Sequence, residues 1–354
     1  MNELEMARTQ INQIDEQMTK LFEERMLAVS KVVNYKLQNN LPIFDGSREQ
    51  IVIEKNLANI KNVDYKEYYE AFIKSTMEIS KKYQRTIANA EVVAYQGVEG
   101  AFSHIATKEL FNNNVLKSFD TFEEVFKAVE KGEATYAVLP FENSYTGEVF
   151  EVFDLLYKYN SKINKVYELE INQNLLALPN TKMQDIKQVY SHHQAISQCK
   201  TFFEKYDNIE LVPFLNTALA GKYVSEQNDK SKAAIASTQT AQLYGLEILA
   251  KNINTSTENT TRFIVISRNQ NKKSSRFSIM FTINHNAGEL ANIIQVISNC
   301  KFNMDCIRSK SVHNVPWQYY FYIEIEGDIQ SEATKDLISK LSQRCETFKV
   351  IGAY

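Results

Sequence analysis

Hydrophobic residues recur every three or four positions through the first 36 residues, without the alternation of a strand. The recurring positions are Ile11, Ile14, Met18, Leu21, Ala28, Val29 and Val32. This period places them on one face of an amphipathic helix from about residue 4 to 36, roughly 50 Å long. A compact domain of 88 residues cannot cover a helix of that length, so we expect a partner chain against it.

The polar stretch LQNNLPIFDGS contains the first proline of the chain and ends this helix. Asp45 or Ser47 is suited to cap a second helix, and the pattern predicts a third helix over residues 64–86. We therefore predict an all-α helical domain over residues 1–88.

The pattern changes at residue 91, where short apolar runs alternate with helical stretches. The runs read VVAYQG, YAVLPF, LLAL, QVYSH, AAIAS and RFIVIS. Such alternation is typical of an α/β domain with a mostly parallel sheet, which we place at residues 91–270. After the polar stretch 268–275, residues 276–354 read as strand, helix, two strands, helix and strand. That order predicts an α+β ferredoxin-like unit, so the chain is multidomain.

Amino-acid composition disfavours some classes of protein but does not indicate a particular enzymatic activity. The 354 residues are 44% hydrophobic and 23% charged, and 40 basic against 43 acidic residues give a net charge of −3. This balance favours neither nucleic acid nor membrane as a partner. The start, MNELEMARTQ, is polar and acidic, and the chain has no apolar run of 18 residues, so we expect a cytoplasmic protein. Four cysteines without a CxxC pair and five scattered histidines predict neither a disulfide framework nor a metal site.

The basic residues of the first helix are spaced too widely for one protomer to bring all of them to a single small ligand. Arg25 and Lys36 are 11 residues apart and share one helix face within about 20°. Arg8 lies about 26 Å along the axis from Arg25, too far to hold the same small ligand. Antiparallel long helices in a dimer would bring Arg8 to the neighbour's site. Taken singly, each of these residues is an ordinary solvated charge.

Eight polar residues of this segment resemble, in identity and order, the site of the all-helical chorismate mutase family. They are Arg8, Arg25, Lys36, Asp45, Arg48, Glu49, Ser80 and Gln84. The resemblance covers nearly all of residues 1–88. It implies rearrangement of chorismate to prephenate without metal, cofactor or covalent intermediate, through positioning and electrostatic stabilisation.

The same resemblance implies roles for these residues. Arg25 and the partner's Arg8 would hold the substrate carboxylates. Lys36 and Gln84 would bond the breaking ether oxygen. Asp45 and Glu49 would bind the region of the ring hydroxyl. Arg48 and Ser80 would complete the binding set.

In the second segment, polar residues follow several apolar strands at their carboxyl ends, where ligands gather in open α/β sheets. They lie in the stretches 92–106, 138–149, 189–199 and 216–224, and include Ser103, Glu142, Asn143, Ser144, His192, Asn216 and Thr217. Each alone is more typical of a turn or helix cap. The spacing Gly97-x-x-Gly100 lacks the dinucleotide-binding pattern.

The stretch ENTTRF (258–263) leads from a polar loop into an apolar strand that begins at Phe263. On its own it predicts only a strand entrance, because threonine and arginine are common at strand edges. With the motifs GxxGAFS, ENSxxG, SHxQA and NTA before it, it resembles prephenate dehydratase over about 180 residues. Two positions depart from the family pattern: Ala101 replaces a usual threonine, and the stretch around Asn172 and Asn174 lacks a frequent histidine.

The dehydratase resemblance implies a two-lobed periplasmic-binding-protein-like fold with prephenate in the cleft between the lobes. We expect Thr261 to bond the leaving hydroxyl and Arg262 to hold a carboxylate. Glu142, kept protonated by desolvation, is our expected proton source. We expect Glu142, Asn143 and Ser144 to face these two residues across the cleft, with Phe263 in the same site.

The third segment resembles an ACT domain, an amino-acid-binding regulatory module. Gly288-Glu289-Leu290 stands for the family's loop before the first helix, and Arg308-Ser309 begins its strand motif. That strand motif departs from the family, since Arg308-Ser309-Lys310-Ser311 lacks its acid and its proline. The resemblance implies phenylalanine as an effector bound between two protomers.

Together the three resemblances imply a bifunctional chorismate mutase/prephenate dehydratase of phenylalanine biosynthesis, at least dimeric, that uses no cofactor. A mutase fused to a prephenate dehydrogenase would need a nicotinamide site, and the Rossmann pattern is missing. Two alternatives remain open: a second segment that binds solute without catalysis, and one degenerate half used only for dimerisation.

Overall fold

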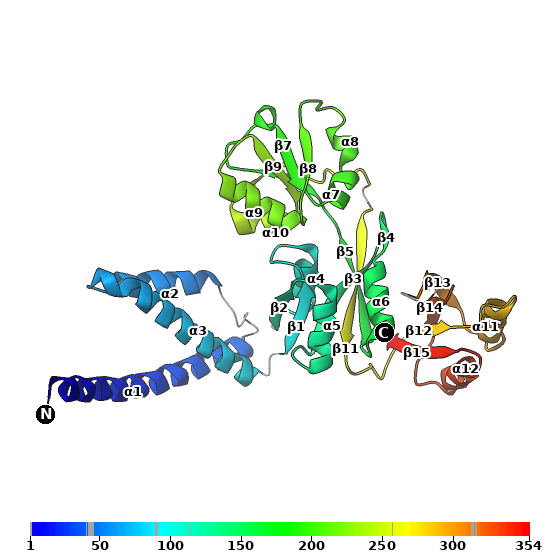
Figure 1. Cartoon of the computed structure of the whole chain (residues 1–354), viewed down its shortest axis with the longest axis horizontal. Helices are drawn as coiled ribbons and strands as arrows, with labels where there is room; N and C mark the ends of the chain where they lie inside the picture. The colour runs from blue at the N-terminus through cyan, green and yellow to red at the C-terminus, as the bar shows by residue number, and fades with distance from the viewer. Residues whose placement is uncertain are drawn as a thin grey trace. The chain divides into compact units, whose positions relative to one another are not determined.

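The computed structural model describes residues 2–39, 41, 46–88, 91–112, 114–256, 258–312, 315 and 317–354. Asp45, predicted as a cap and as a substrate ligand, lies outside these residues. The chain forms two compact units, Met1–Glu91 with Asn112–Val115, and Val92–Phe111 with Leu116–Tyr354 (Figure 1). In the described part of the chain, no helix combines the length and apolarity needed to cross a bilayer.

The first unit is helical, as its period of three and four predicts. Helix α1 (Glu3–Gln38) runs unbroken for 36 residues from a capping box made by Asn2 and Glu5. Helix α2 (Gly46–Ala58) follows, and a 3₁₀ turn η1 (Val63–Tyr65) leads into α3 (Lys66–Ala88). Helix α3 packs against both α1 and α2. Val33 is the buried residue of α1, so most of its apolar stripe is exposed within one protomer.

The second unit begins with a lobe built on a sheet with helices against it. Its strands are β1 (Val92–Gln96), β2 (Val115–Phe119), β3 (Tyr136–Asn143), β4 (Gly147–Glu148), β5 (Lys162–Glu170) and β11 (Thr260–Ser267). Its helices are α4 (Phe102–Leu110), α5 (Phe122–Lys131) and α6 (Phe150–Lys158). The apolar runs of β1, β3 and β11 are almost wholly buried, as expected for central strands covered on both faces.

A second lobe is inserted between β5 and β11. Its five-stranded sheet over the described residues has the order β10-β6-β9-β7-β8. The strands are β6 (Asn174–Ala177), β7 (Gln188–Ser191), β8 (Glu210–Pro213), β9 (Lys232–Ala236) and β10 (Glu247–Ala250). The helices are η2 (Met183–Asp185), α7 (His193–Gln198), α8 (Lys200–Phe203), α9 (Thr217–Gln227) and α10 (Thr238–Tyr244).

The prediction of a mostly parallel sheet is wrong, because both sheets are mixed. Strand β1 pairs parallel with β3, but β11 pairs antiparallel with both β3 and β5. The reason is the path of the chain: β5 leads out of the first lobe towards the second, and β11 leads back. Two neighbouring strands that leave and re-enter one lobe must run in opposite directions.

The C-terminal part has the predicted order of strands and helices. It consists of β12 (Arg276–Thr282), α11 (Glu289–Asn299), β13 (Met304–Ser311), β14 (Tyr319–Glu326), α12 (Glu332–Ser342) and β15 (Thr347–Ala353). The strand order β13-β14-β12-β15, antiparallel throughout, is that of a ferredoxin-like unit.

This part joins the first lobe through one strand pair and a shared core. Gly352 of β15 pairs in parallel with Ile163 of β5, which continues the sheet of the lobe. Phe141 stacks on Phe153 with ring centroids 4.2 Å apart, and the Tyr322 ring meets both edge-on. Aromatic contacts of this kind add to the free energy of apolar burial, so they stabilise the docked arrangement.

Candidate active sites

The helical unit contains a pocket of about 290 Å³ between its three helices. It is lined by Arg25, Ala28, Val29, Val32, Lys36, Arg48, Glu49, Val52, Met77, Ser80, Lys81 and Gln84. Six of the eight residues predicted for the mutase site are therefore brought together. Arg8 is not among the lining residues, since it lies about 26 Å along α1 from Arg25.

Polar contacts organise this pocket around α3. Arg25 donates a hydrogen bond to the hydroxyl of buried Ser80, which donates to the Thr76 carbonyl at 2.8 Å. Partial burial lowers the pKa of Arg25. The ammonium group of Lys81 lies 2.6 Å from the Glu49 carboxylate. The pocket thus combines guanidinium, ammonium and hydroxyl groups suited to a dianion.

Sequence reasoning missed Lys81, although a signal was available. Lys81 precedes Gln84 by three positions and follows Met77 by four, so all three side chains share one face of α3. A helical projection of α3 from Gln84 would have identified it.

The second pocket, of about 470 Å³, lies between the two lobes of the second unit. The first lobe lines it from β1, α4, α5, β3, β4 and β11, and the second lobe from α7 and α9. The predicted residues that line it are Ser103, Asn143, His192, Asn216, Thr217, Thr261 and Phe263. Residues from five separate motifs therefore meet in one interlobe cleft.

Thr261 and Asn143 form the polar centre of this cleft. They face each other on neighbouring strands, and the Asn143 amide nitrogen donates to the Thr261 hydroxyl at 2.9 Å. The orientation of the amide is determined, because its oxygen accepts from the backbone N–H groups of Tyr145 and Thr146 at 3.0 Å. Thr261 therefore accepts from Asn143 and keeps its own proton for a group in the cleft.

None of the described residues that line the cleft is lysine or arginine. The positive electrostatic potential in the cleft therefore comes from helix N-termini. Helix α4 begins after Ala101, which makes no side-chain capping bond, and its first-turn residues Phe102 and Ser103 line the pocket. Helix α9 begins at the pocket with Thr217, after the cap Asn216. Helix N-termini of both lobes thus offer N–H donors and positive dipole ends to an anion.

The histidine of the cleft favours its neutral form. Burial lowers the pKa of His192 below its ordinary value, and the adjacent His193 lowers it further. An imidazole with this shift acts at neutral pH as a hydrogen-bonding group rather than as a cation.

Three of the four glutamines that line the cleft, Gln96, Gln173 and Gln198, were not predicted from the sequence. The fourth, Gln194, belongs to the SHxQA motif that the sequence singled out. Gln173 is buried next to the β6 strand, and its side-chain oxygen has no hydrogen-bond partner among the residues that the structure describes. Its side-chain nitrogen lies 3.4 Å from the Gln198 oxygen. The signal was weak, because Gln96, Gln173 and Gln198 belong to different parts of the fold and share no spacing that indicates a site.

Glu142, Ser144 and Arg262 lie elsewhere than predicted. They line a separate groove of about 730 Å³ rather than the interlobe cleft. The physical reason is strand alternation: neighbours along β3 and β11 point to opposite faces, so Asn143 and Thr261 face the cleft while Glu142 and Arg262 face away. Neither Arg262 nor Glu142 is among the described residues that line the cleft, so this geometry gives no support to the carboxylate-binding role expected of Arg262 or to the proton-donor role expected of Glu142.

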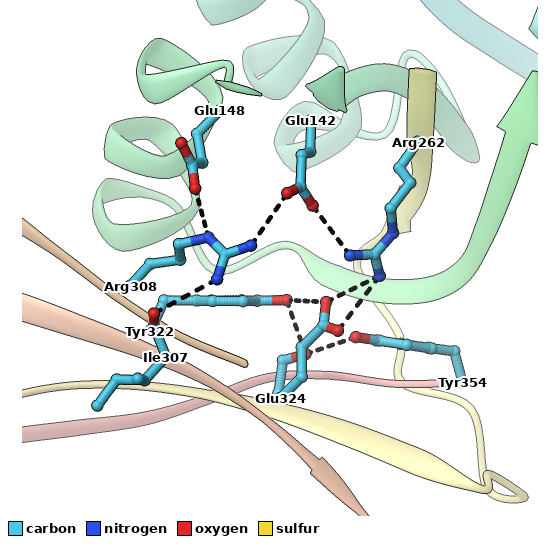
Figure 2. Close-up of polar contacts among 9 residues, drawn as sticks. Glu142, Glu148, Arg262, Ile307, Arg308, Tyr322, Glu324 and Tyr354 are labelled. Atoms are coloured by element: carbon cyan, nitrogen blue, oxygen red, sulfur yellow. Dashed lines mark hydrogen bonds and ion pairs between the residues drawn. The ribbon is translucent and has the colours of Figure 1, made fainter. Parts of the chain in front are cut away.

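Arg262 and Glu142 are instead paired with the C-terminal part of the chain. Arg262 donates to Glu142 at 3.1 Å and to both carboxylate oxygens of Glu324, at 3.1 and 3.2 Å (Figure 2). Burial alone would lower the pKa of Arg262, but the Glu324 charge and the hydrogen bonds that the guanidinium donates to both carboxylates raise it overall. Ser144 accepts from Thr260 N–H and donates to the Glu258 carbonyl, which closes the loop before β11.

A third pocket, of about 520 Å³, lies at the start of α11. Gly288 and Leu290 line it, together with Asn284, His285, Asn286, Trp317, Tyr319 and Phe321. Glu289 is not among the lining residues. Arg308 points to Glu142 rather than to this pocket, and Ser309 is exposed on β13.

Comparison with known proteins agrees with both enzymatic resemblances. The family model of prephenate dehydratase matches residues 93–271, and that of chorismate mutase type II matches residues 7–85. A bifunctional chorismate mutase/prephenate dehydratase of Buchnera aphidicola subsp. Acyrthosiphon pisum (strain APS) is 32% identical over 371 residues. The match covers 100% of this chain and 96% of the relative.

Solved structures share the fold of the second unit. The prephenate dehydratase of Staphylococcus aureus subsp. aureus Mu50 superimposes with a TM-score of 0.64 at 26% identity, covering 74% of this chain and 99% of that one. The prephenate dehydratase of Arthrobacter aurescens, in complex with L-Phe, gives 0.70 at 23% identity, covering 74% and 89%. With both domains in one chain and a relative matched over 96% of its length, this chain belongs to the bifunctional chorismate mutase/prephenate dehydratase family of phenylalanine biosynthesis.

Proposed function

We propose that the two reactions of the family take place in the two pockets described above. Chorismate rearranges to prephenate in the helical pocket, and prephenate loses CO₂ and water in the interlobe cleft to give phenylpyruvate. The observation that carries the second assignment is the Thr261 hydroxyl, oriented by Asn143 at 2.9 Å within a cleft that receives helix N-termini from both lobes.

In the helical pocket the chain needs only to compact a dianion and stabilise an oxygen. Arg25 and Arg48 suit the carboxylates through their planar guanidinium groups. Lys36 and Gln84 are the donors proposed for the breaking ether oxygen, where negative charge develops. Glu49, held by Lys81 at 2.6 Å, is the acceptor proposed for the ring hydroxyl. Such preorganised donors accelerate a rearrangement without forming a bond to substrate.

A second copy of the chain would complete this site. The large apolar side chains of α1 that are exposed include Leu4, Ile11, Ile14, Met18 and Leu21. An antiparallel partner helix would bury this stripe and bring the partner's Arg8 towards the pocket, where the single protomer has no residue from the first turns of α1. We therefore propose a homodimer through the helical unit.

In the interlobe cleft the reaction is driven by aromatisation. The bond from ring carbon C1 to its carboxylate breaks, and its electron pair forms a ring double bond while the C4–oxygen bond breaks. Hydroxide departs, takes up a proton and leaves as water. Thr261 donates a hydrogen bond to this departing oxygen, which stabilises the charge it gains in the transition state.

The carboxylates of prephenate would lie at the helix N-termini of the cleft. First-turn backbone N–H groups of α4 and α9 replace the arginine that the sequence led us to expect. The unpartnered Gln173 oxygen accepts only from a donor, so it suits the substrate hydroxyl rather than a carboxylate.

The C-terminal part would be an ACT-like sensor that binds phenylalanine, the product of the pathway. The pocket beside Gly288 and Leu290 combines aromatic and amide groups suited to such a ligand. The Arthrobacter aurescens relative, which shares the fold, holds L-Phe. A cytoplasmic location stays a prediction from the sequence.

Purified full-length protein tests these proposals directly. Chorismate or prephenate is supplied separately, with and without phenylalanine, and prephenate and phenylpyruvate are followed by chromatography. We expect both conversions, with the second slowed by phenylalanine. Accumulation of prephenate without phenylpyruvate would refute the dehydratase assignment, and rates unaffected by phenylalanine would refute the sensor.

A further inference from the structure

Five charged side chains form a continuous network between the dehydratase cleft and the C-terminal part of the chain. The cleft side contributes Glu142, Glu148 and Arg262, and the C-terminal part contributes Arg308 and Glu324 (Figure 2). All five lie in one unit of the structure. None of them belongs to the polar centre formed by Thr261 and Asn143.

Glu324 anchors the network from the far side. Its side chain is 3% exposed, in the buried part of β14, where an uncompensated carboxylate would be strongly unfavourable. Arg262 donates to both of its oxygens, at 3.1 and 3.2 Å, and the Tyr322 hydroxyl donates at 2.6 Å. A buried acid with these partners holds the Arg262 guanidinium in one place.

Arg308 forms a second connection, to the strand that carries Asn143. It donates to Glu142 at 3.0 Å and forms an ion pair with Glu148. Glu142 and Glu148 are paired residues of the β3–β4 hairpin, and Glu148 lines the cleft together with Asn143 and Thr146. The C-terminal part therefore contacts both strands that supply the polar centre.

Two residues contacted by the C-terminal part are one position along the chain from the residues of the polar centre. Arg262 pairs with Glu142 on the rung of the β11–β3 ladder next to the rung on which Thr261 pairs with Asn143. Strand alternation directs the first pair away from the cleft and the second pair into it. Arg262 and Glu142, which the C-terminal part contacts, are therefore the immediate chain neighbours of Thr261 and Asn143.

We infer that Arg262 and Glu324 are positioning residues of the dehydratase, which set the Thr261–Asn143 geometry from outside the cleft and make it depend on the docked C-terminal part. This inference rests on the proposed dehydratase activity. Arg262 is then no ligand of the substrate carboxylate, because its guanidinium is engaged on both sides by Glu142 and Glu324. The departing hydroxide needs a donor held within a fraction of an ångström, so displacement lowers turnover more than affinity.

The test uses full-length Glu324→Gln, Arg262→Gln and their double variant, with kcat and KM measured for prephenate. We expect each single variant to lose about 10- to 100-fold in kcat with KM changed less than about threefold, as for a small misplacement of a catalytic group. The double variant should be no worse than the poorer single one, because both break the same contact. Arg262→Lys, which retains the charge but not the fork, should recover part of the loss.

Glu326→Gln is the matched control, since Glu326 lies on the same strand and its side chain is half exposed beside Arg276. It should leave kcat unchanged. Mutase activity of each sample measures the amount of active chain, and circular dichroism checks the fold. Where Glu324→Gln does not fold, Arg308→Gln, at the more exposed end of the network, decides instead.

Three results would overturn the inference. The first is a tenfold or larger rise in KM at unchanged kcat for Arg262→Gln, which would make Arg262 a substrate ligand. The second is wild-type kcat in folded Glu324→Gln or Arg308→Gln. The third is full additivity in the double variant. Wild-type protein that does not convert prephenate at all would instead refute the proposed function itself.

Discussion

Replacing Thr261 by valine removes one hydroxyl from the cleft and leaves the volume of the side chain almost unchanged. Thr261 is 8% exposed, and its oxygen accepts from Asn143 at 2.9 Å, so its proton is the part available to a ligand. Loss of one preorganised donor to a developing negative charge costs about 2.7–4 kcal/mol in the transition state, or about 10²- to 10³-fold in kcat.

The folded state should be affected much less by this change. The Asn143 amide nitrogen loses one acceptor but keeps the Asn259 side-chain oxygen at 2.8 Å. The loss in free energy of unfolding should therefore stay near about 1 kcal/mol, the usual contribution of one hydrogen bond. Urea unfolding of both proteins measures this difference.

The assay is the steady-state formation of phenylpyruvate from prephenate. Thr260→Val is the matched control, because it makes the same chemical change one residue away on the other face of β11, where Thr260 lines the separate groove. Mutase activity in each sample corrects for concentration. Retention of kcat within about threefold in Thr261→Val, or an equal loss in Thr260→Val, would refute the role assigned to the hydroxyl.

Three further predictions follow from other parts of the chain. Gln84→Ala should lower the mutase kcat by at least about tenfold, because a donor to the ether oxygen acts mainly in the transition state. The mutase KM should change less, and dehydratase activity should be unchanged. An unchanged mutase kcat would contradict this role of Gln84. Gly352→Ala would place a methyl group 2.4 Å from the Ile163 carbonyl oxygen. We therefore expect the free energy of unfolding of the second unit, measured in urea, to fall by about 1–3 kcal/mol. An unchanged urea midpoint would contradict the pairing of β15 with β5. Burial lowers the pKa of His192 in the folded chain, so between this pKa and the ordinary histidine pKa of 6.5 the unfolded chain binds more protons than the folded chain. The free energy of unfolding of the wild type should therefore fall relative to that of His192→Gln as the pH drops through 6.5, and the difference should become constant below the folded-state pKa. A stability difference between the two proteins that does not change with pH would contradict the burial of this imidazole.

Much of the site could be predicted because its residues follow local rules. Arg25, Lys36, Ser80 and Gln84 meet in one pocket as helix periodicity and the family resemblance predicted. Ser103, Thr217 and His192 lie where strands end and helices begin, a position that turn chemistry marks in the sequence. Gln173 gave no such signal, since its place depends on how the two lobes approach.

Arg262 lies in a different place from the one that its motif led us to expect. Because it follows Thr261 in the sequence, we expected it to bind the same ligand. Successive side chains of a strand point to opposite faces of the sheet, so the two residues face different sites. Its partner Glu324 is 62 residues away in the chain, and nothing in the composition of β14 marks that acid as buried. Only the docking of the C-terminal sheet removes it from solvent and brings it to the guanidinium.

Local patterns in the sequence predicted the helices of the first unit, the strands β1, β3, β6, β7, β9 and β11, the ferredoxin-like order and the membership of the polar motifs, because these depend on periods of a few residues and on local turn chemistry. Strand β5, which lies between β15 and β11 in the sheet, was not among the predicted apolar runs. Tertiary structure decided which face of β11 looks into the cleft, the mixed direction of the sheets and the pairing of Arg262 with Glu324. Those features depend on contacts between segments far apart in the chain. Their free energy comes from burial and charge pairing that exist only once the lobes and the C-terminal part have packed together.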